Sequence, residues 1–297
     1  MIDHEQPLDP LAAFERERGR LFGIAYRMLG TVSEAEDVMQ DAYIRWHAAD
    51  HPTITNSSAY LLRMTTRLCI DALKSARNRR TEYIGPWLPE PLISSAPADD
   101  PAALHELADD LSFALLVTLE RLSPLERAVF LLHESFGYSY DEIAAIVGRS
   151  NEHCRQIARR ARQHLARDDR PQRADPQQHD RLLHQFIHAA ASGNLQDLID
   201  LLAADVVLTS DGGGKAQAVR RPVVGAEAVA KLLQWIMRNA TDDWATTLAS
   251  VNGRTGIITT VAGRVAGVLT MEIANDRINK VFIVVNPDKL ARLRTGA

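Results

Sequence analysis

Hydrophobic and polar positions follow two different periods along the chain, and the change of period divides it into parts. Residues 10–80 and 105–167 place apolar side chains three or four positions apart with little glycine or proline, which predicts helices. After about residue 206, β-branched runs such as Thr255–Val261 and Lys280–Val285 predict strands separated by Gly or Asn turns. The chain is therefore expected to form helices first and an α+β unit last.

Two stretches rich in proline or charge mark the boundaries between these parts. Residues 81–104 hold five prolines, and charged residues cluster at Arg167–Pro176; proline removes the backbone donor that a helix needs. The elements expected beyond this point are helices at about 178–191, 195–203 and 226–239 and strands at 206–209, 244–252, 255–262, 264–274 and 277–286. The domain boundaries that follow are 10–80, a linker at 81–104, a helical segment at 105–170 and an α+β tail at 177–290.

Composition limits the class of protein. The 297 residues suffice for two or three compact units. No apolar run approaches the roughly 20 residues that cross a bilayer, and the N-terminus lacks the order of a signal peptide, so we expect a cytoplasmic protein without membrane contact. Cys69 and Cys154 lie in separate predicted helices, and we therefore expect no disulfide, no metal site and no cofactor.

The net charge of −4 hides an uneven distribution of charge. Residues 149–170 hold seven arginines against three acidic residues, whereas the linker at 81–104 holds four acidic residues and no Lys or Arg. A local basic face can steer a protein to phosphate whatever the charge of the whole chain. Residues 149–170 are therefore the first candidate for contact with nucleic acid.

The basic stretch coincides with a predicted helix-turn-helix between Asp141 and Leu165. Ile143, Ala144 and Val147 give a first short helix an apolar side, Gly148 supplies a left-handed turn, and Ser150 can cap the second helix. The second helix is expected to bury Cys154, Ile157, Ala158, Ala161 and Leu165. Its outward residues, expected to contact bases and phosphates, are Asn151, Glu152, His153, Arg155, Gln156, Arg159 and Arg160. Taken alone, the pattern also fits an ordinary helical hairpin with a solvated face.

Two more candidate faces lie in residues 10–80. Ser33 and Glu36 predict a capping box at the start of a helix that buries Ala35, Val38, Ala42 and Trp46. The opposite face carries Asp37, Gln40, Asp41 and Arg45. The next helix, 59–80, is expected to bury Leu62, Thr65, Cys69, Ala72, Leu73 and Ala76 and to expose a basic stripe of Arg63, Arg67, Lys74, Arg77, Arg79 and Arg80. Either outer face could simply be solvated.

The stretch Ser123–Leu165 resembles region 4 of the extracytoplasmic-function (ECF) sigma factors, and the run AEDVMQD at residues 35–41 resembles region 2.2 of the same family. The resemblance implies two partners: core RNA polymerase, through its β′ clamp and β flap, and promoter DNA. It implies that the face with Asp37 docks on the β′ clamp helices, that residues 51–80 recognise the −10 element and capture a flipped base, and that residues 149–162 read the −35 element. Departures from the family are Arg67, where many relatives have Asn, Cys154, where valine is usual, and His153 and Gln156 on the reading face.

Three short motifs, WLPEP at 87–91, DGGGK at 211–215 and NPDKL at 286–290, resemble in that order the sigma J type of this family. The resemblance covers about residues 10–290 and implies a multidomain fold: two all-α domains, a region 2 helical bundle and a region 4 helix-turn-helix, followed by an α+β cone-shaped SnoaL-like domain. It further implies that the tail is a built-in regulator. The residues implied in its contacts are Trp87, Pro89, Asp211, Gly213, Lys215, Asn286, Asp288 and Lys289. By itself, DGGGK could be a plain hairpin turn.

Two rival functions stay open beside the sigma factor. A repressor or activator with a ligand-sensing tail would have no use for the AEDVMQD helix. An isomerase could use Asp211 as general base, paired with Glu272, but all six tyrosines lie at or before Tyr140, so the tail lacks that oxyanion donor. The tail histidines His179, His184 and His188 are expected to be solvated or partly packed. We therefore expect no enzyme activity, although a small apolar ligand could occupy the cone.

Overall fold

The structure, a computed structural model, describes residues 9–80, 83–94, 112–165 and 175–293, with the side chains of residues 76–80 and 94 left outside the description. It divides into two compact units. The described residues of the first unit are 9–80 and 118–165, and those of the second are 83–94, 112–117 and 175–293. This differs from the predicted boundaries, because both helical segments share one unit and the linker joins the unit of the tail.

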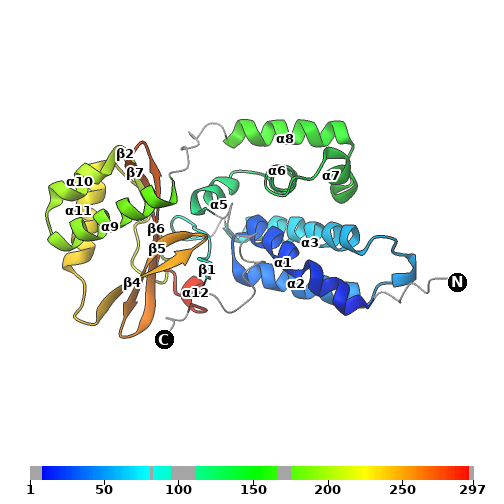
Figure 1. Cartoon of the computed structure of the whole chain (residues 1–297), viewed down its shortest axis with the longest axis horizontal. Helices are drawn as coiled ribbons and strands as arrows, with labels where there is room; N and C mark the ends of the chain where they lie inside the picture. The colour runs from blue at the N-terminus through cyan, green and yellow to red at the C-terminus, as the bar shows by residue number, and fades with distance from the viewer. Residues whose placement is uncertain (1–8, 81–82, 95–111, 166–174, 294–297) are drawn as a thin grey trace. The chain divides into compact units, whose positions relative to one another are not determined.

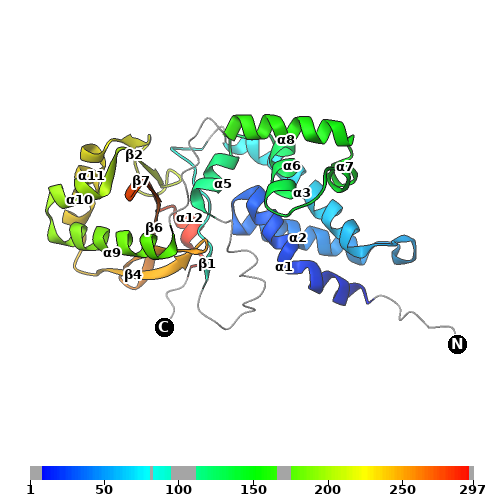
Figure 2. The same ribbon diagram turned by 45° about the horizontal axis from the view of Figure 1, so that its top comes forward.

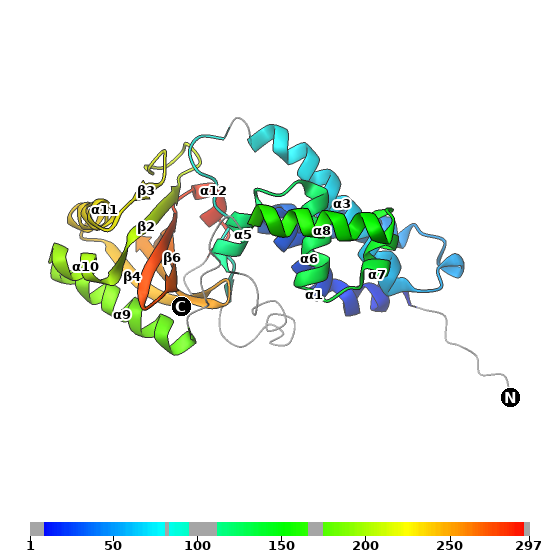
Figure 3. The same cartoon turned by 90° about the horizontal axis from the view of Figure 1, so that it is seen from above.

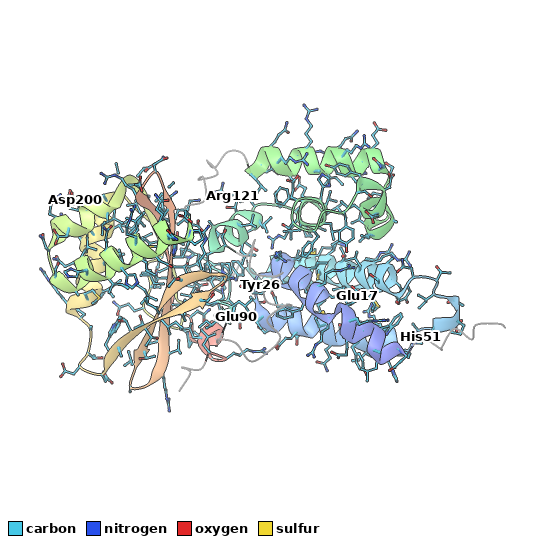
Figure 4. The ribbon with its side chains drawn as sticks, in the orientation of Figure 1. Glu17, Tyr26, His51, Glu90, Arg121 and Asp200 are labelled. Carbon is cyan, nitrogen blue, oxygen red and sulfur yellow. The ribbon has the colours of Figure 1, made fainter. Side chains whose placement is uncertain are left out.

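The first unit opens with three helices that pack together around a buried core (Figure 1). These are α1 (Pro10–Leu29), α2 (Val32–His47) and α3 (Ser57–Arg80), with a 3₁₀ turn η1 (His51–Thr53) between the last two. Tyr26 of α1 lies inside this bundle (Figure 4). The indole Nε1 of Trp46 donates to the carbonyl of Pro10 at 2.7 Å and so ties the end of α2 to the start of α1.

The start of α2 corrects one expectation. Thr31 caps this helix: its Oγ1 accepts from the N–H of Glu34 at 3.4 Å and donates to the Glu34 carboxylate at 2.9 Å. The predicted capping box of Ser33 and Glu36 is wrong. The left-handed turn at Gly30 (φ 76°) ends α1, so α2 begins two residues earlier than expected, and Thr31 and Glu34, which have the same spacing, form its cap. The predicted buried residues of α2, Ala35, Val38, Ala42 and Trp46, are confirmed.

The buried face of α3 is wider than the sequence indicated. Of the predicted residues, Leu62, Thr65, Cys69 and Leu73 are buried, Ala72 is half-buried, and the side chain of Ala76 lies outside the description. Leu61, Thr66 and Ile70 are buried as well. The reason is that α3 contacts α1 and α2 on one side and two later helices on another, so a single stripe does not contain all its buried positions.

The later helices are α5 (Phe113–Leu119), α6 (Pro124–Glu134), α7 (Tyr140–Val147) and α8 (Asn151–Leu165). In the first unit α6 packs between α8 on one side and α1 and α3 on the other (Figure 1). Ser123 and Glu126 form a capping box before α6, with Pro124 in its first turn. The buried guanidinium of Arg127 donates to the carbonyl of Met28 at 2.6 Å and to the Glu120 carboxylate at 2.7 Å, which links α6 to α1.

The second unit is a curved sheet with helices on one face, the α+β cone that was predicted. The helices α9 (Pro176–Ser192), α10 (Leu195–Leu201) and α11 (Ala226–Arg238) lie on that face (Figures 1 and 3). The strands are β1 (Ile93–Ser94), β2 (Leu202–Asp211), β3 (Val223–Val224), β4 (Trp244–Val251), β5 (Arg254–Val261), β6 (Arg264–Ala274) and β7 (Arg277–Val284). Their order in the sheet is β1-β4-β5-β6-β7-β2-β3. Strands β2 and β7 are parallel, and all other neighbouring strands of this sheet are antiparallel.

The strand β1 comes from the linker, where the sequence predicted no regular structure. It pairs with β4 through Ile93 opposite Val251. Asn252 reinforces the pairing: its side chain accepts from the N–H of Leu92 at 3.0 Å, and its own N–H donates to the carbonyl of Leu92 at 2.8 Å. The prolines exclude a helix here, but they leave residues 92–94 free to pair as an edge strand.

The sheet has a separate apolar cluster on each face. On the helix side, α9, α10 and α11 cover a cluster that includes Phe186, Leu208 and Leu233. On the opposite side, Leu88 of the linker and Phe113 of α5 join Phe282 and Val284 of β7 and Leu290. Leu290 ends the short helix α12 (Pro287–Leu290), which lies beside β6 (Figure 2). The linker and the first turn of α5 are thus part of the tail's own core.

Candidate functional site

The helix-turn-helix has the predicted local geometry. Gly148 is left-handed (φ 67°, ψ 47°) between α7 and α8, and Ser150 Oγ accepts from the N–H of His153 at 3.2 Å. The predicted buried stripe of α8 is confirmed for Cys154, Ile157, Ala158, Ala161 and Leu165. On α7 the buried residues are Ile143 and Ile146, whereas Ala144 and Val147, expected on the apolar side, are half-buried.

The outward residues of α8, which we call the α8 face, include three exposed arginines. Glu152, Arg155, Gln156, Arg159 and Arg160 are exposed, and Asn151 and His153 are half-buried. Asn151 Nδ2 donates to the Asp141 carboxylate at 2.5 Å, and the guanidinium of Arg155 lies 5.7 Å from the ring centre of Tyr140. Side chains stand out from α8 on the side away from α6 (Figure 4). The contacts that they make with DNA stay a prediction.

One neighbouring arginine is already paired. Arg162 Nε donates to the Glu134 carboxylate at 2.8 Å, and its Nη2 donates to the Tyr140 hydroxyl at 3.2 Å. The bond to Glu134 raises the pKa of Arg162 above its usual value. Arg162 therefore holds α8 against α6, in contrast to the α8 face.

The residues predicted to bind polymerase share one exposed surface of α2, which we call the α2 face. Asp37, Gln40, Asp41 and Arg45 are all exposed. Ile44 is 56% exposed on the same turns of the helix, a residue that the sequence reasoning missed. The available signal was an isoleucine three residues after Asp41 on an otherwise polar face. A single exposed aliphatic side chain is common on protein surfaces, so docking by the α2 face stays a prediction.

The basic stripe of α3 is only partly described. Arg63, Arg67 and Lys74 are exposed, and the side chains of Arg77, Arg79 and Arg80 lie outside the described residues. Lys74 Nζ pairs with the Asp71 carboxylate at 2.9 Å. Arg67 Nη2 lies 3.5 Å from the position of a Cβ built on Gly148. The predicted −10 helix therefore meets the turn of the helix-turn-helix inside the first unit.

The loop before α3, predicted to capture a −10 base, is built from local contacts. The His51 ring meets the Trp46 ring edge-on at 4.4 Å between centres, and His51 is labelled at the tip of this loop (Figure 4). Asn56 Oδ1 accepts from the N–H of Ala59 at 2.9 Å and starts α3. These contacts shape the loop, and its role in base capture stays a prediction.

The most elaborate polar site lies in the second unit, around Asp211 at the end of β2. Asp211 is fully buried, and its carboxylate accepts four hydrogen bonds. The donors are the Tyr83 hydroxyl at 2.6 Å, the Leu88 N–H at 2.8 Å, the Gly213 N–H at 2.9 Å and the Lys289 ammonium at 2.7 Å. Two of these donors belong to the linker. We call the group of Tyr83, Leu88, Asp211, Asn286 and Lys289 the linker clamp.

Lys289 completes the linker clamp from α12. It is 6% exposed and donates both to Asp211 and to the carbonyl of Leu88. Its ammonium also lies 4.3 Å from the ring centre of Trp87 and 5.3 Å from that of Tyr83. Burial, followed by the bond to Asp211, raises the pKa of Tyr83 far above its usual value. The linker is therefore held by a buried ion pair rather than by surface charges.

The glycine loop gives the clamp its shape. Gly213 has φ 59°, and a Cβ built on it would lie 2.3 Å from Asn286 Nδ2, the group that donates to the Tyr83 hydroxyl at 2.8 Å. A Cβ on Gly214 would lie 2.9 Å from Cδ1 of Ile84. The close approach of linker and loop therefore requires glycine at these positions. Lys215 reaches the Asp288 carboxylate at 2.6 Å on the exposed rim, and Pro89 is buried.

The structure argues against Asp211 as a general base. Its carboxylate is enclosed by four donors and does not line the cavity of the tail. Glu272 lines a separate small pocket with His179 and Arg254. A tyrosine does reach Asp211, but it is Tyr83 of the linker. His179 of α9 is buried rather than solvated, because it lies against strand residues such as Met271 and Glu272, while His184 and His188 are exposed.

A cavity of about 660 Å³ opens between α9, α11 and the sheet of the tail. Its lining is mainly apolar and includes Phe186, Trp235, Trp244, Val268 and Ile283. Within the described residues we find no cluster of three or more metal-ligand side chains. Among the residues that the structure describes, no helix is long and apolar enough to span a membrane.

Comparisons with known proteins agree with this architecture. The family model for Sigma-70 region 2 matches residues 13–79, and that for Sigma-70, region 4, matches residues 112–165. The ECF RNA polymerase sigma factor SigJ of Mycobacterium tuberculosis is 34% identical over 94% of this chain and 92% of its own length. The probable ECF RNA polymerase sigma factor SigI of the same species is 35% identical over 96% and 97%. The crystal structure of M. tuberculosis SigJ superposes with a TM-score of 0.77, at 32% identity, over 95% of this chain and 98% of that one.

Regions 2 and 4 joined by a linker, with an exposed helix-turn-helix, define an RNA polymerase sigma factor, a protein of transcription initiation. A SnoaL-like α+β tail follows these regions, as in the SigJ structure. The chain belongs to the ECF RNA polymerase sigma factors.

Proposed function

We propose that the tail of this sigma factor controls transcription by holding the linker. The observation that carries the proposal is the linker clamp: Asp211, fully buried at the end of β2, accepts hydrogen bonds from Tyr83 and from the N–H of Leu88. Removing the linker would leave the Asp211 carboxylate without two of its four donors, which is costly for a buried charge. The buried Asp211 carboxylate therefore favours the state in which the linker is bound.

The same residues of the linker have a second proposed place. The linker holds no Lys or Arg, so it suits the basic RNA path of the polymerase better than it suits DNA. A linker held in the clamp is not free to enter that path. We infer that clamping and assembly on polymerase exclude each other, and that the clamp lowers activity until it opens.

The remaining contacts of the sigma factor are proposed from exposed residues. The α2 face, with Asp37, Asp41 and Ile44, would dock on the β′ clamp. The stripe of α3 and the loop at 51–58 would bind the −10 element, and the α8 face would read the −35 element near the β flap. A protein that works on polymerase would act in the cytoplasm. We propose a regulatory and not a catalytic tail, because the buried Asp211 is occupied by the clamp.

The proposal is tested by run-off transcription with core polymerase. Tyr83→Phe deletes one hydroxyl that bonds both Asp211 and Asn286, and we expect it to raise promoter-specific transcription roughly three- to tenfold, as about 1 kcal/mol of lost clamp stability implies. Tyr138→Phe in the first unit is the matched control and should leave transcription unchanged.

Equal activity of wild type and Tyr83→Phe would contradict control by the clamp. Deleting residues from about 175 onward should also change transcription. That deletion is a coarser test, because it exposes Phe113 of α5, which packs on the sheet.

A further inference from the structure

The cavity on the helix side of the tail's sheet has the size and chemistry of a small-molecule site. Its volume of about 660 Å³ lies within the range of roughly 300–1,000 Å³ typical of such sites. None of the described residues that line it carries a charge. A charged ligand would lose its hydration there without gaining a partner, so the cavity selects neutral molecules.

Among the polar side chains of the lining, two offer buried hydrogen-bond donors. The indole Nε1 of Trp244 is buried with no acceptor among the described residues. Ser210 Oγ accepts from the N–H of Val219 at 2.9 Å, which leaves its own hydrogen to donate. Since buried donors are normally paired, an occupant with an uncharged acceptor oxygen would satisfy what the protein leaves open.

The aromatic residues of the cavity favour a flat molecule. Phe186 lines the buried end at 3% exposure, and Trp244 adds a second ring. Trp235 and Met237 of α11 also line the cavity, yet they are 49% and 37% exposed, which marks them as its rim. Large apolar side chains at a rim lose water when a ligand enters.

We propose that this cavity binds a neutral, flat, mainly apolar small molecule with one hydrogen-bond acceptor, and that its occupancy is coupled to the linker clamp. The coupling rests on the proposed control by that clamp, whereas ligand binding does not.

The strands that wall the cavity also carry the clamp, because successive side chains of a strand face opposite ways. On β2, Ser210 lines the cavity and Asp211 next to it holds the linker. After β7, Val285 lines the cavity while its N–H donates to the carbonyl of Asp211 at 2.8 Å. Val268 belongs both to the lining and to the cluster around Leu88. A ligand that shifts this thin wall moves the clamp as well, since packed interiors transmit small displacements.

Binding is tested on the full chain with Prodan, 6-propionyl-2-(dimethylamino)naphthalene, a neutral flat ketone whose emission shifts to the blue in apolar surroundings. We expect saturable binding of one molecule per chain. The analogue without the carbonyl should bind roughly three- to tenfold more weakly, the effect of one hydrogen bond. The charged toluidinonaphthalene sulfonate should bind at least roughly tenfold more weakly than Prodan.

Two variants locate the site. Ala190→Phe fills the cavity from α9 and should abolish saturable binding, whereas Gln185→Phe on the exposed side of the same helix should preserve it. Trp244→Phe keeps an aromatic ring but removes the donor. The affinity of this variant for Prodan should therefore be no higher than the affinity of the wild type for the analogue without the carbonyl. This second variant keeps the test valid if Ala190→Phe unfolds by circular dichroism. Unchanged Prodan binding in both variants, or tighter binding of the sulfonate, would overturn the ligand proposal.

Coupling is tested by hydrogen–deuterium exchange of the linker peptide 83–93 with and without saturating Prodan. We expect the exchange rates of these amides to change by at least roughly threefold. A change of roughly threefold corresponds to a shift of under 1 kcal/mol in the free energy of local opening. Saturable binding with unchanged linker exchange would overturn the coupling alone. Absence of Prodan binding, with transcription still altered by Tyr83→Phe, would sink the ligand site and leave the proposed function standing.

Discussion

The α8 face and the linker clamp use the same kinds of charged side chain in opposite surroundings. On α8, Arg155, Arg159 and Arg160 stand in water, where a charge is inexpensive to keep and open to a new partner. In the clamp, Asp211 and Lys289 are 0% and 6% exposed and bonded to each other and to Leu88. We propose that the exposed charge of the α8 face binds DNA, whereas the buried charge of Asp211 and Lys289 already has its partners, among them the linker.

The largest effect is expected from breaking the buried ion pair. Lys289→Met leaves the Asp211 carboxylate buried without its cation and should destabilise the clamp by about 3–5 kcal/mol. Hydrogen–deuterium exchange of residues 83–93 measures this loss as faster exchange. The matched control is Lys215→Met, whose partner Asp288 is 63% exposed, and whose loss should cost about 1 kcal/mol or less. Equal effects of the two substitutions would remove the contrast between buried and exposed charge.

A smaller effect is expected from filling the close approach at the glycine loop. Gly213→Ala adds a Cβ at positive φ within 2.3 Å of Asn286 Nδ2 and should destabilise the second unit by about 2 kcal/mol. Gly193→Ala, also at positive φ (72°) but with no other described residue within 4 Å of the added Cβ, should cost about 1 kcal/mol. Thermal unfolding followed by circular dichroism compares them. A larger loss in Gly193→Ala would contradict the packing argument.

Alkaline pH should loosen the clamp. Because burial and the bond to Asp211 raise the pKa of Tyr83, the folded state favours the neutral phenol. The stability that Tyr83 contributes is therefore complete below the ordinary tyrosine pKa of about 10 and is lost as the pH rises toward the higher folded value. Phenolate absorbance during an alkaline titration should show one fewer late-ionising tyrosine in Tyr83→Phe. The same number of late phenols in that variant would refute the assignment.

The smallest change in stability is expected on the α8 face. Arg159→Ala should leave the free energy of unfolding within about 0.5 kcal/mol of wild type. It should still weaken promoter binding by the holoenzyme and lower the salt dependence of the affinity by about one counterion. Arg162→Ala, whose guanidinium is held by Glu134, is the control and should keep the wild-type salt slope. A slope unchanged by Arg159→Ala would exclude a phosphate contact for this residue.

The helical unit could be predicted well because its information is local. All five residues of the predicted α8 stripe are buried, and Gly148 and Ser150 act as turn and cap. A helix that buries one side repeats every three or four residues, and that repeat is visible in any single sequence. Where a helix packs on two sides, as α3 does, the same reasoning missed Leu61 and Ile70.

The linker clamp could be anticipated only as a set of motifs. Nothing near Asp211 or Lys289 in the sequence distinguishes them from surface charges, because their burial depends on distant segments. Tyr83 lies outside WLPEP and was missed, although it is the tyrosine that reaches Asp211. The pairing of β1 with β4 joins Ile93 to Val251, and such long-range pairing leaves no local signal.

The arrangement of the clamp also sets an order in time. Lys289 lies 201 residues after Leu88, the linker residue to which it donates. Because a ribosome adds about 5–20 residues per second, a nascent chain carries a finished linker for roughly 10–40 s before Lys289 is made. Region 4 ends at residue 165, so during the last part of that interval, roughly 6–25 s, regions 2 and 4 are complete while the proposed restraint is absent. Under the proposed control, each newly made copy therefore passes once through the unclamped state, which the mature protein regains only when the clamp opens.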